Sequence, residues 1–417
     1  MRMKLKSNKG ITLIALVITI IVLLILAGVS IAMLTGENGL LTKASDSKKE
    51  TDKAGAKEAV QMEVAGSFTT TGTYDMNQAK ENLKNNLKIP ASDIKDNSNG
   101  SFNVKYKGIE LTVMLNGQVI EKTVLPGEKV EKTEKNNYTD EKGRKATVPA
   151  GFIVVPGCET IDGGLVISDN EADTEKEGVT KQALGNQFVW IPVASADVYQ
   201  RDFSYPSYYD IDSDNTPEGS TFTDTGYLPA SIQPSTDDKI NNEEAERQAV
   251  IKYNGFYIGR YEAGKEGQNT VVCKNGVSVY NNITQIDAKT KAKELCSDNQ
   301  NVECALCSGI QWDMVMKFVD GKQDGQNKIF NVRVYDSTRH KGSLSETGLN
   351  DNDKVQNIYD LEGNCFEYVA EKNNTSDSFV YRGGNYLSHS LYKASLRFSN
   401  TGSANSYEAF RPTLYIK

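Results

Sequence analysis

The most apolar stretch of the chain lies near its N-terminus. Residues 11–34 read ITLIALVITIIVLLILAGVSIAML, a run of 24 residues without a charged side chain, which as a helix would be about 36 Å long. Four basic residues precede this run, and positive charge holds such a flank on the cytoplasmic side of a membrane. We therefore expect a transmembrane helix over residues 11–34, with the rest of the chain outside the cell.

Helical spacing continues beyond the apolar run. Ala56, Val60 and Val64 are four residues apart on a background of charged side chains, which predicts a stalk helix. A second apolar stripe, from residue 76 to residue 87, predicts another helix that ends before Pro90.

The pattern then changes from helical spacing to alternation. Residues 102–106 alternate between apolar and polar side chains, and segments 109–115 and 118–121 meet across Asn116-Gly117. This dipeptide is the strongest short signal for a two-residue hairpin turn. We expect a three-stranded meander, and with the two helices a small α+β module over residues 35–122.

The remaining chain divides into a charged segment and a large domain. Residues 123–149 are rich in Lys and Glu and predict a linker. From residue 150 to 417, short apolar runs broken by Gly, Asn and Ser predict mixed α and β structure. Capping boxes at Thr284–Asp287 and Ser308–Gln311 each predict a helix start, and Trp312 falls on the apolar face of the second helix, as a core residue would.

Charge and cysteine content limit the classes of function that the chain can have. The chain has 47 basic and 55 acidic residues, a net charge of −8, and no basic cluster in its body, which argues against nucleic-acid binding. All six cysteines follow residue 150, and Cys304 and Cys307 have the spacing of a redox or zinc half-site. No second pair of this spacing occurs, so we expect structural cysteines, some of them disulfide-bonded.

The N-terminus resembles the leader of type IV prepilins. In that family a short basic peptide ends in glycine and is removed ahead of the apolar helix, which here implies a leader over residues 1–10 and processing between Gly10 and Ile11. The family usually has Glu at the fifth mature position, where this chain has Ala15. A plain signal anchor is the alternative, whereas a secretory signal would have a shorter apolar core.

The large domain resembles the formylglycine-generating enzyme family, a variant of the C-type lectin fold. The matching segments are residues 185–192 (GNQFVWIP), 255–262 (GFYIGRYE), 294–296 (ELC), 311–313 (QWD), 357–367 (NIYDLEGNCFE), 382–384 (RGG) and 410–412 (FRP). The resemblance implies a C-type lectin fold over residues 150–417. Because the family includes oxidases, iron-dependent sulfoxide synthases and binding proteins, the fold alone does not give the activity.

The residues at the family's metal positions argue against catalysis. The oxidases bind copper through two cysteines that correspond to Ser388 and Lys393 here, and soft Cu(I) requires sulfur ligands. The sulfoxide synthases bind iron through several histidines, whereas this chain has only His340 and His389. We therefore expect no enzyme activity, no metal site and no cofactor.

The segment between the last two motifs has the composition of a binding surface. Tyr provides large contact area at low entropic cost, and Ser and Asn provide adaptable hydrogen bonds, as in antibody loops. We predict a ligand-binding face over residues 385–408, formed by Asn385, Tyr386, Ser388, His389, Ser390, Tyr392, Ser399, Asn400, Asn405, Ser406 and Tyr407.

This face also resembles the variable region of C-type-lectin-fold proteins that diversity-generating retroelements mutate. In those proteins the mutated Asn codons yield residues such as Asn, Tyr, Ser, His and Leu. The predicted face fits that set, with Lys393 and Glu408 as exceptions. The resemblance implies a binding face that varies between copies of the gene.

Together these features predict an α+β protein that is anchored in the cell membrane or associated with a pilus and displays a ligand-binding domain outside the cell, as an adhesin or receptor does. The expected partners are an extracellular protein or other surface macromolecule, the membrane through residues 11–34, and other subunits if the chain is a pilin. Two alternatives stay open, a structural minor pilin and a formylglycine-generating-type enzyme with a non-cysteine site.

Overall fold

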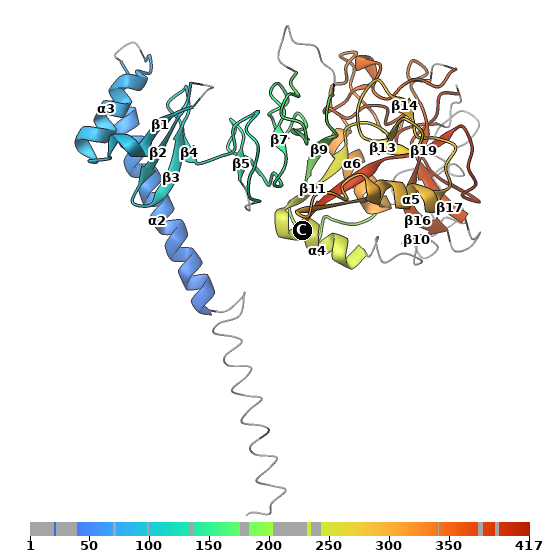
Figure 1. Cartoon of the computed structure of the whole chain (residues 1–417), viewed down its shortest axis with the longest axis horizontal. Helices are drawn as coiled ribbons and strands as arrows, with labels where there is room; N and C mark the ends of the chain where they lie inside the picture. The colour runs from blue at the N-terminus through green and yellow to red at the C-terminus, as the bar shows by residue number, and fades with distance from the viewer. Residues whose placement is uncertain are drawn as a thin grey trace, which may run out of the picture. The chain divides into compact units, whose positions relative to one another are not determined.

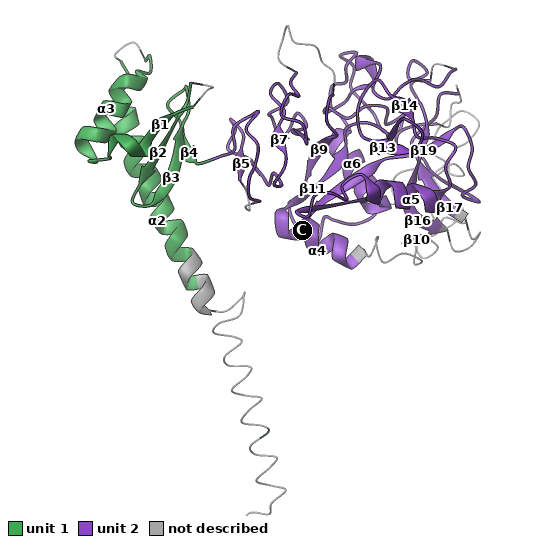
Figure 2. Cartoon of the chain, viewed as in Figure 1, with its two compact units in different colours: residues 1–122 green, residues 123–417 purple. Residues whose placement is uncertain are grey.

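The computed structural model divides the chain into two compact units, Met1–Lys122 and Thr123–Lys417 (Figure 2). The structure describes residues 21, 40–69, 72–97, 100–133, 137–175, 183–202, 232–234, 243–340, 342–373, 378–387 and 392–417. Each unit has its own buried apolar core, as expected of an independent domain.

Within its described residues, the smaller unit contains two α-helices and one antiparallel sheet. The elements are α2 (Leu40–Ala65), α3 (Met76–Asn86), the short 3-10 turn η1 (Ala91–Asp93), β1 (Ile94–Asp96), β2 (Phe102–Tyr106), β3 (Ile109–Val113) and β4 (Val119–Glu121). The sheet order is β1-β2-β3-β4. The predicted helices and the three predicted strands are confirmed, and β1 is an additional edge strand.

Helical spacing explains how the helix α2 joins this unit. Ala56, Val60 and Val64 are buried together with Leu83 of α3 and with the inward side chains of the sheet. The hairpin is confirmed, but its loop has three residues, 115–117, and not the predicted two, because Met114 and not Leu115 pairs with Gln118, to whose carbonyl the Met114 N–H donates at 2.8 Å. Gly117 has a φ of +77° and its N–H donates to the carbonyl of Met114 at 2.9 Å. A positive φ costs glycine nothing, which explains the Asn-Gly signal.

Two sheets form the frame of the larger unit (Figure 1). The six-stranded antiparallel sheet has the order β15-β20-β11-β9-β8-β7 and consists of β7 (Ile153–Val154), β8 (Val166–Ser168), β9 (Gln187–Pro192), β11 (Gly255–Gly259), β15 (Val302–Leu306) and β20 (Pro412–Ile416). The last strand of the chain therefore lies inside this sheet, between β11 and β15.

The second sheet contains residues 397–400 and residue 408 of the predicted binding segment. Its strands are β10 (Ile232–Pro234), β16 (Phe366–Asn373), β17 (Ser378–Arg382), β18 (Arg397–Asn400) and β19 (Glu408–Phe410). The order is β10-β16-β17-β18, and β19 pairs in parallel with the start of β16. Smaller elements are the hairpin β5 (Tyr138–Thr139) and β6 (Lys145–Ala146), the sheet of β12 (Gly264–Glu266), β13 (Thr270–Val272) and β14 (Ser278–Val279), and the 3-10 turn η5 (Asp351–Asp353).

Three helices cover the two sheets, α4 (Glu243–Tyr253), α5 (Gln285–Glu294) and α6 (Gly309–Val319). Helix α6 packs against β9 of the first sheet and β16 of the second. Its start is a full capping box, in which Ser308 and Gln311 exchange hydrogen bonds, as predicted. Trp312 is completely buried in the core, also as predicted, and its indole N–H donates to the carbonyl of Ala394 at 3.1 Å.

The segment predicted as a linker, residues 123–149, is instead part of the larger unit. Val130, Tyr138, Ala146 and Val148 are buried in one apolar cluster with residues of the first sheet. The Tyr138 hydroxyl donates to the carbonyl of Glu159 at 2.6 Å. The prediction missed this because single apolar residues among many charged ones give neither helical nor strand periodicity.

The predicted leader and membrane span lie outside the described residues, apart from Ile21. This includes the processing positions Gly10 and Ile11. Among the residues that the structure describes, no helix has both the length and the apolar character needed to cross a bilayer.

Candidate ligand-binding face

Three arginines fix the backbone of the predicted binding segment. Arg382 lies at its start, Arg397 in its middle and Arg411 just after its end, and all three side chains are completely buried. A buried guanidinium is tolerated only beside a carboxylate. The chain at each arginine must therefore pack where a carboxylate can pair with it.

The first two arginines share one carboxylate on helix α6. Asp313 accepts from Arg382 Nη2 through Oδ1 and from Arg397 Nη2 through Oδ2, both at 2.7 Å. Arg382 Nε also donates to the carbonyl of Leu396 at 2.9 Å. Burial lowers the pKa of Arg382, and Asp313 opposes that shift. Strands β17 and β18 are thereby held on the helix that carries Trp312.

The third arginine connects the two sheets. Arg411 Nε donates to Glu367 Oε2 of β16 at 2.9 Å, and its Nη1 and Nη2 donate to the carbonyls of Gly259 and Tyr359 at 3.0 and 2.8 Å. Burial raises the pKa of Glu367 even though Arg411 opposes that shift. This one side chain therefore satisfies acceptors from β11, from the loop before β16, and from β16 itself.

The side chains of strand β16 point alternately toward the buried arginines and toward the predicted binding segment. Successive side chains of a strand point to opposite sides, so Glu367 faces the core while Phe366 and Tyr368 face the predicted segment. The Phe366 ring lies 4.8 Å from the ring of Tyr392 between centroids. The Tyr368 hydroxyl bonds to Asn400 Oδ1 at 3.3 Å and to Glu408, and burial raises the pKa of both Tyr368 and Glu408.

Several of the predicted binding residues instead hold the segment in shape. Asn385 is buried, with its Oδ1 accepting from the Leu387 N–H at 2.9 Å. Asn405 Oδ1 accepts from the Tyr407 N–H at 2.8 Å, and the carbonyl of Ser406 accepts from Asn281 Nδ2 at 2.9 Å.

The other predicted residues differ in their accessibility. Ser399, Asn400 and Tyr392 are half-buried around β18. Ser388, His389 and Ser390 lie outside the described residues.

Two tyrosines of the predicted set, the half-buried Tyr386 and the exposed Tyr407, form a ring pair. The rings of Tyr386 and Tyr407 lie 5.8 Å apart between centroids, and Tyr407 is 40% exposed. Their backbones are fixed from below, because the Tyr386 N–H donates to the carbonyl of Asn364 at 2.7 Å and the Phe366 N–H donates to the carbonyl of Tyr407 at 2.8 Å. The pair thus presents aromatic surface on a rigid support.

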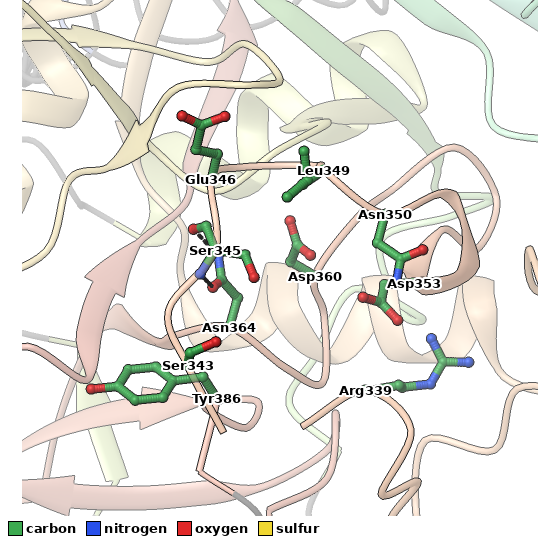
Figure 3. A pocket seen from close by; sticks show the side chains of 10 residues that line it. All are labelled: Arg339, Ser343, Ser345, Glu346, Leu349, Asn350, Asp353, Asp360, Asn364 and Tyr386. Carbon is green, nitrogen blue, oxygen red and sulfur yellow. Dashed lines mark hydrogen bonds between the residues drawn. The ribbon is translucent and has the colours of Figure 1, made fainter. Parts of the chain in front are cut away.

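A cavity of about 300 Å³ adjoins Tyr386 (Figure 3). It is lined by Arg339, Ser343, Ser345, Glu346, Leu349, Asn350, Asp353, Asp360, Asn364 and Tyr386. Only Tyr386 belongs to the predicted face. The other residues come from the loop that precedes β16. Residues 357–367, which resemble a motif of the formylglycine-generating enzyme family, overlap this loop but were not predicted to take part in binding.

The loop around this cavity has an unusual backbone. Asn357, Asp360 and Asn364 have φ values of 63°, 59° and 58°, and Asn and Asp tolerate this left-handed conformation better than other residues with a Cβ atom. Asp360 Oδ2 accepts from the Gly348 N–H at 2.8 Å, and Asn364 Oδ1 accepts from the Ser345 N–H at 2.9 Å. The side chains of Asp360 and Asn364, which line the cavity, thus also hold its loop in place.

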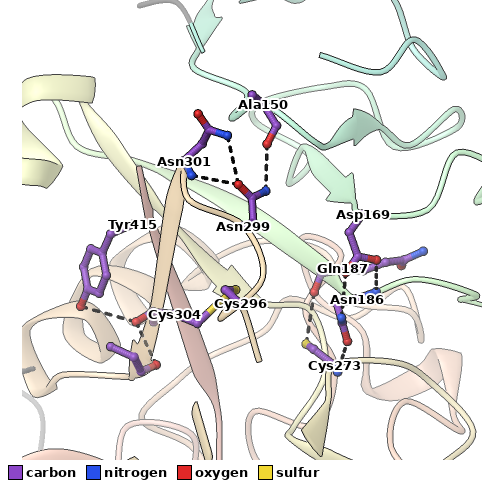
Figure 4. The surroundings of a disulfide bond; sticks show 12 residues. Ala150, Asp169, Asn186, Gln187, Cys273, Cys296, Asn299, Asn301, Cys304 and Tyr415 are labelled. Carbon is purple, nitrogen blue, oxygen red and sulfur yellow. Dashed lines mark hydrogen bonds between the residues drawn. A yellow bond between two sulfur atoms is a disulfide. The ribbon is translucent and has the colours of Figure 1, made fainter. Parts of the chain in front are cut away.

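The cysteines have structural roles, as predicted. Cys304 is bonded to Cys296 and not to Cys307, so the Cys304-Ala-Leu-Cys307 spacing marks no redox pair (Figure 4). Burial raises the pKa of Cys158 to about 12 and that of Cys273 to about 11, which keeps both as thiols at neutral pH. The disulfide-closed loop borders a second, open cavity of about 840 Å³. Among the described residues, no three His, Cys, Asp or Glu side chains are grouped as a metal site.

Lys393, at a position where the resembled oxidases bind copper, is buried. Its side chain is almost inaccessible, and Nζ has no hydrogen-bond partner among the residues that the structure describes. Burial lowers the pKa of Lys393, and the carboxylate of Glu362 opposes this shift. An ammonium group in this environment costs folding free energy.

We expect the Asp313→Asn variant to lose about 3–5 kcal/mol of unfolding free energy, because Arg382 and Arg397 would stay buried without the carboxylate that accepts their hydrogen bonds. Glu371 Oε2 would remain 4.0 Å from Arg397 Nε. Both tryptophans of the chain, Trp190 and Trp312, lie in cores of the larger unit, so tryptophan fluorescence in a urea titration reports this unit. The exposed Asp298→Asn variant should shift the midpoint very little. An equal midpoint for Asp313→Asn and wild type would contradict the role of the shared carboxylate.

The Lys393→Met variant should be more stable than the wild type at pH 7, by about 1–3 kcal/mol, since it removes a buried charge and keeps most of the volume. The pKa of Lys393 is below 10.5 in the folded state, so the unfolded chain binds more protons between the two values. Wild-type stability should therefore rise as pH increases toward 10.5, and the variant should lack that contribution. Urea midpoints of the wild type and of Lys393→Met, taken from pH 7 to pH 10, measure this contribution. A variant that is less stable at every pH would refute this account.

Comparison with known proteins gives only distant similarities. No model of a known protein family matches the chain, and no curated protein matches it. Treponema denticola variable protein 1 is similar over 38% of this chain and 95% of its own, at 13% identity and a TM-score of 0.23. CarF is similar over 39% and 87%, at 12% identity and a TM-score of 0.26. The Major Tropism Determinant P3c variant is similar over 78% and 83%, at 12% identity and a TM-score of 0.26. The mixed helix and sheet architecture is as predicted, but similarities this low do not assign a family.

Proposed function

We propose that the chain is a ligand-binding protein of the cell surface, acting as an adhesin or receptor, and that its larger unit is a C-type lectin fold with the binding face in residues 385–408. The observation that supports this most directly is the ring pair of the half-buried Tyr386, which lines the cavity of about 300 Å³, and the exposed Tyr407. Location at the membrane rests on the sequence of residues 1–34 alone.

Rigid aromatic side chains on a fixed support are suited to recognition. Tyrosine buries a large area and loses little entropy, since it has only two side-chain torsions. The Tyr386 N–H donates to the carbonyl of Asn364, and the Phe366 N–H donates to the carbonyl of Tyr407, so the backbone of the pair is fixed before any ligand arrives. Pre-organisation of this kind reduces the entropic cost of binding.

The proposal includes recognition without catalysis. The buried amine of Lys393 occupies a position where the resembled oxidases require an accessible thiolate. The thiols of Cys158 and Cys273 are also buried, and their pKa values are raised. These groups are therefore poorly suited to metal ligation or nucleophilic attack.

Diversification of the face is compatible with the framework described above. Arg382, Arg397 and Arg411 fix the backbone through contacts that do not involve the tyrosine pair or Ser399. Substitutions at exposed positions between the arginines would therefore change the surface and leave the packing intact, because surface changes away from buried networks usually cost little stability.

Sequencing the gene from independent isolates tests the diversification. Substitutions should concentrate at positions accessible to water, such as the half-buried Tyr386 and Ser399 and the exposed Tyr407, while Asp313 and the three framework arginines stay constant. A reverse transcriptase gene nearby and a near-repeat of the 3′ end with adenines at these codons should accompany the pattern. Substitutions spread evenly over residues 150–417 would contradict diversification.

Binding itself can be tested with a phage library of random 12-residue peptides, panned on the full-length chain purified in detergent. Peptides selected by the wild type should bind the Tyr386→Ala/Tyr407→Ala variant at least tenfold more weakly, since aromatic anchors commonly contribute 2 kcal/mol or more, about thirtyfold. The matched control is Ile286→Ala, which removes another exposed apolar side chain, 63% exposed, on helix α5. Equal effects of the two changes would show that residues 385–408 are not the preferred binding face.

A further inference from the structure

The cavity of about 840 Å³ beside the disulfide is separate from the proposed binding face. It shares no lining residue with the cavity beside Tyr386, and none of its lining residues belongs to the segment 385–408. Its volume lies within the range of ligand pockets. Amides are the most frequent side chains along its wall, namely those of Asn186, Asn299, Gln300 and Asn301. We call it the amide cavity.

A covalent bond and a hydrogen bond hold the wall of the amide cavity in place (Figure 4). The disulfide between Cys296 and Cys304 closes the loop that carries three of the four amides. Asn299 Nδ2 donates to the carbonyl of Ala150 at 2.9 Å and attaches this loop to the opposite part of the wall. A wall that is fixed in advance lowers the entropic cost of binding a ligand.

The bonds that orient the amides leave part of each amide free for a ligand. Asn186 Nδ2 donates to Asp169 Oδ2 at 2.8 Å. Asn301 Nδ2 donates to Asn299 Oδ1 at 3.2 Å. An amide nitrogen has two N–H donors, and each of the three asparagines uses one of them within the described part of the chain. The side chain of Gln300 is exposed and makes no hydrogen bond with the described residues.

The floor of the amide cavity is apolar, but no aromatic face is accessible on it. Phe152 and Phe188 line the cavity and are only 3% and 0% exposed. Their rings pack edge to face on each other, with 6.2 Å between the centroids. Stacking of a sugar ring on an aromatic face is therefore excluded here. Recognition must depend on hydrogen bonds from the amides around the opening.

We propose that the amide cavity binds an extended polypeptide segment of a protein ligand, mainly through the peptide N–H and C=O groups of that segment. Each peptide unit has one donor and one acceptor, and the side-chain amide of Asn or Gln has the same two groups in one plane. A row of oriented amides therefore complements a main chain. The half-buried Leu295 offers apolar contact to the side chains of the segment. This site is additional to the proposed face at residues 385–408.

The same phage library tests the site when it is panned on the full-length Tyr386→Ala/Tyr407→Ala variant, which lacks the aromatic rings of the proposed face. Selected peptides should bind about tenfold more weakly when Gln300→Trp is added to this variant, because the indole fills the opening of the cavity. The matched control is Gln268→Trp in the same background. Gln268 is exposed in the turn between β12 and β13, and this change should leave the affinity unaltered.

Recognition of the main chain is tested on synthetic copies of a selected peptide, each with one N-methylated peptide bond. At one or more internal positions the affinity should fall about tenfold, because methylation removes a main-chain donor. This measurement needs no further substitution in the protein, so it decides the question even if Gln300→Trp lowers the urea midpoint.

Several outcomes would overturn the inference. These are the absence of any enriched peptide, equal binding of the peptides with and without Gln300→Trp, and affinity that N-methylation leaves unchanged at every position. A saccharide on a glycan array that binds the parent variant but not Gln300→Trp would show a different occupant and also overturn it. None of these results bears on peptides that depend on Tyr386 and Tyr407, so the proposed face is judged by its own experiment.

Discussion

A buried guanidinium needs a carboxylate beside it, and the larger unit meets this requirement at three points along a single stretch of chain. Asp313 serves Arg382 and Arg397, and Glu367 serves Arg411. None of these groups is accessible to water, so leaving any of them unpaired would cost several kcal/mol, roughly as for other buried ion pairs broken on one side. The course of residues 382–411 is therefore fixed by charge pairing beneath the surface and not by the side chains that face outward.

Strand β16 connects this framework with the recognition surface. Its Glu367 holds Arg411 in the core, while the adjacent Phe366 and Tyr368 support the polar segment on the other side. Because neighbouring side chains of a strand cannot exchange sides without a register shift, the buried pair also sets the orientation of the aromatic support. The stability of the unit and the geometry of its binding face thus depend on the same five-residue stretch, 364–368.

The sequence predicts elements with strong local signals and misses those that depend on tertiary contacts. Capping residues such as Ser308 and the Asn116-Gly117 dipeptide act within a few residues, so the helix start and the position of the hairpin could be predicted, although the hairpin loop is one residue longer than the predicted turn. The packing of residues 123–149 could not, because Tyr138 and Val148 find their partners only in the folded unit. For the binding face, composition identified Tyr386 and Tyr407, but it could not show that Asn385 points inward or that Asp360 joins the site from a separate loop.

The location of the cavity relative to the framework has a consequence for a variable protein. Its carboxylates lie on the loop before β16, held by Asn364 and by the backbone of Gly348, whereas Tyr386 and Tyr407 belong to the segment between the arginines. Under the proposed function, substitutions in that segment would alter the aromatic side chains beside the cavity without altering the loop that forms the rest of its wall. Such a surface would keep one part of the site constant while the contacts that distinguish one ligand from another change. Specificity is a difference between affinities, so variation of the segment alone is sufficient to change it.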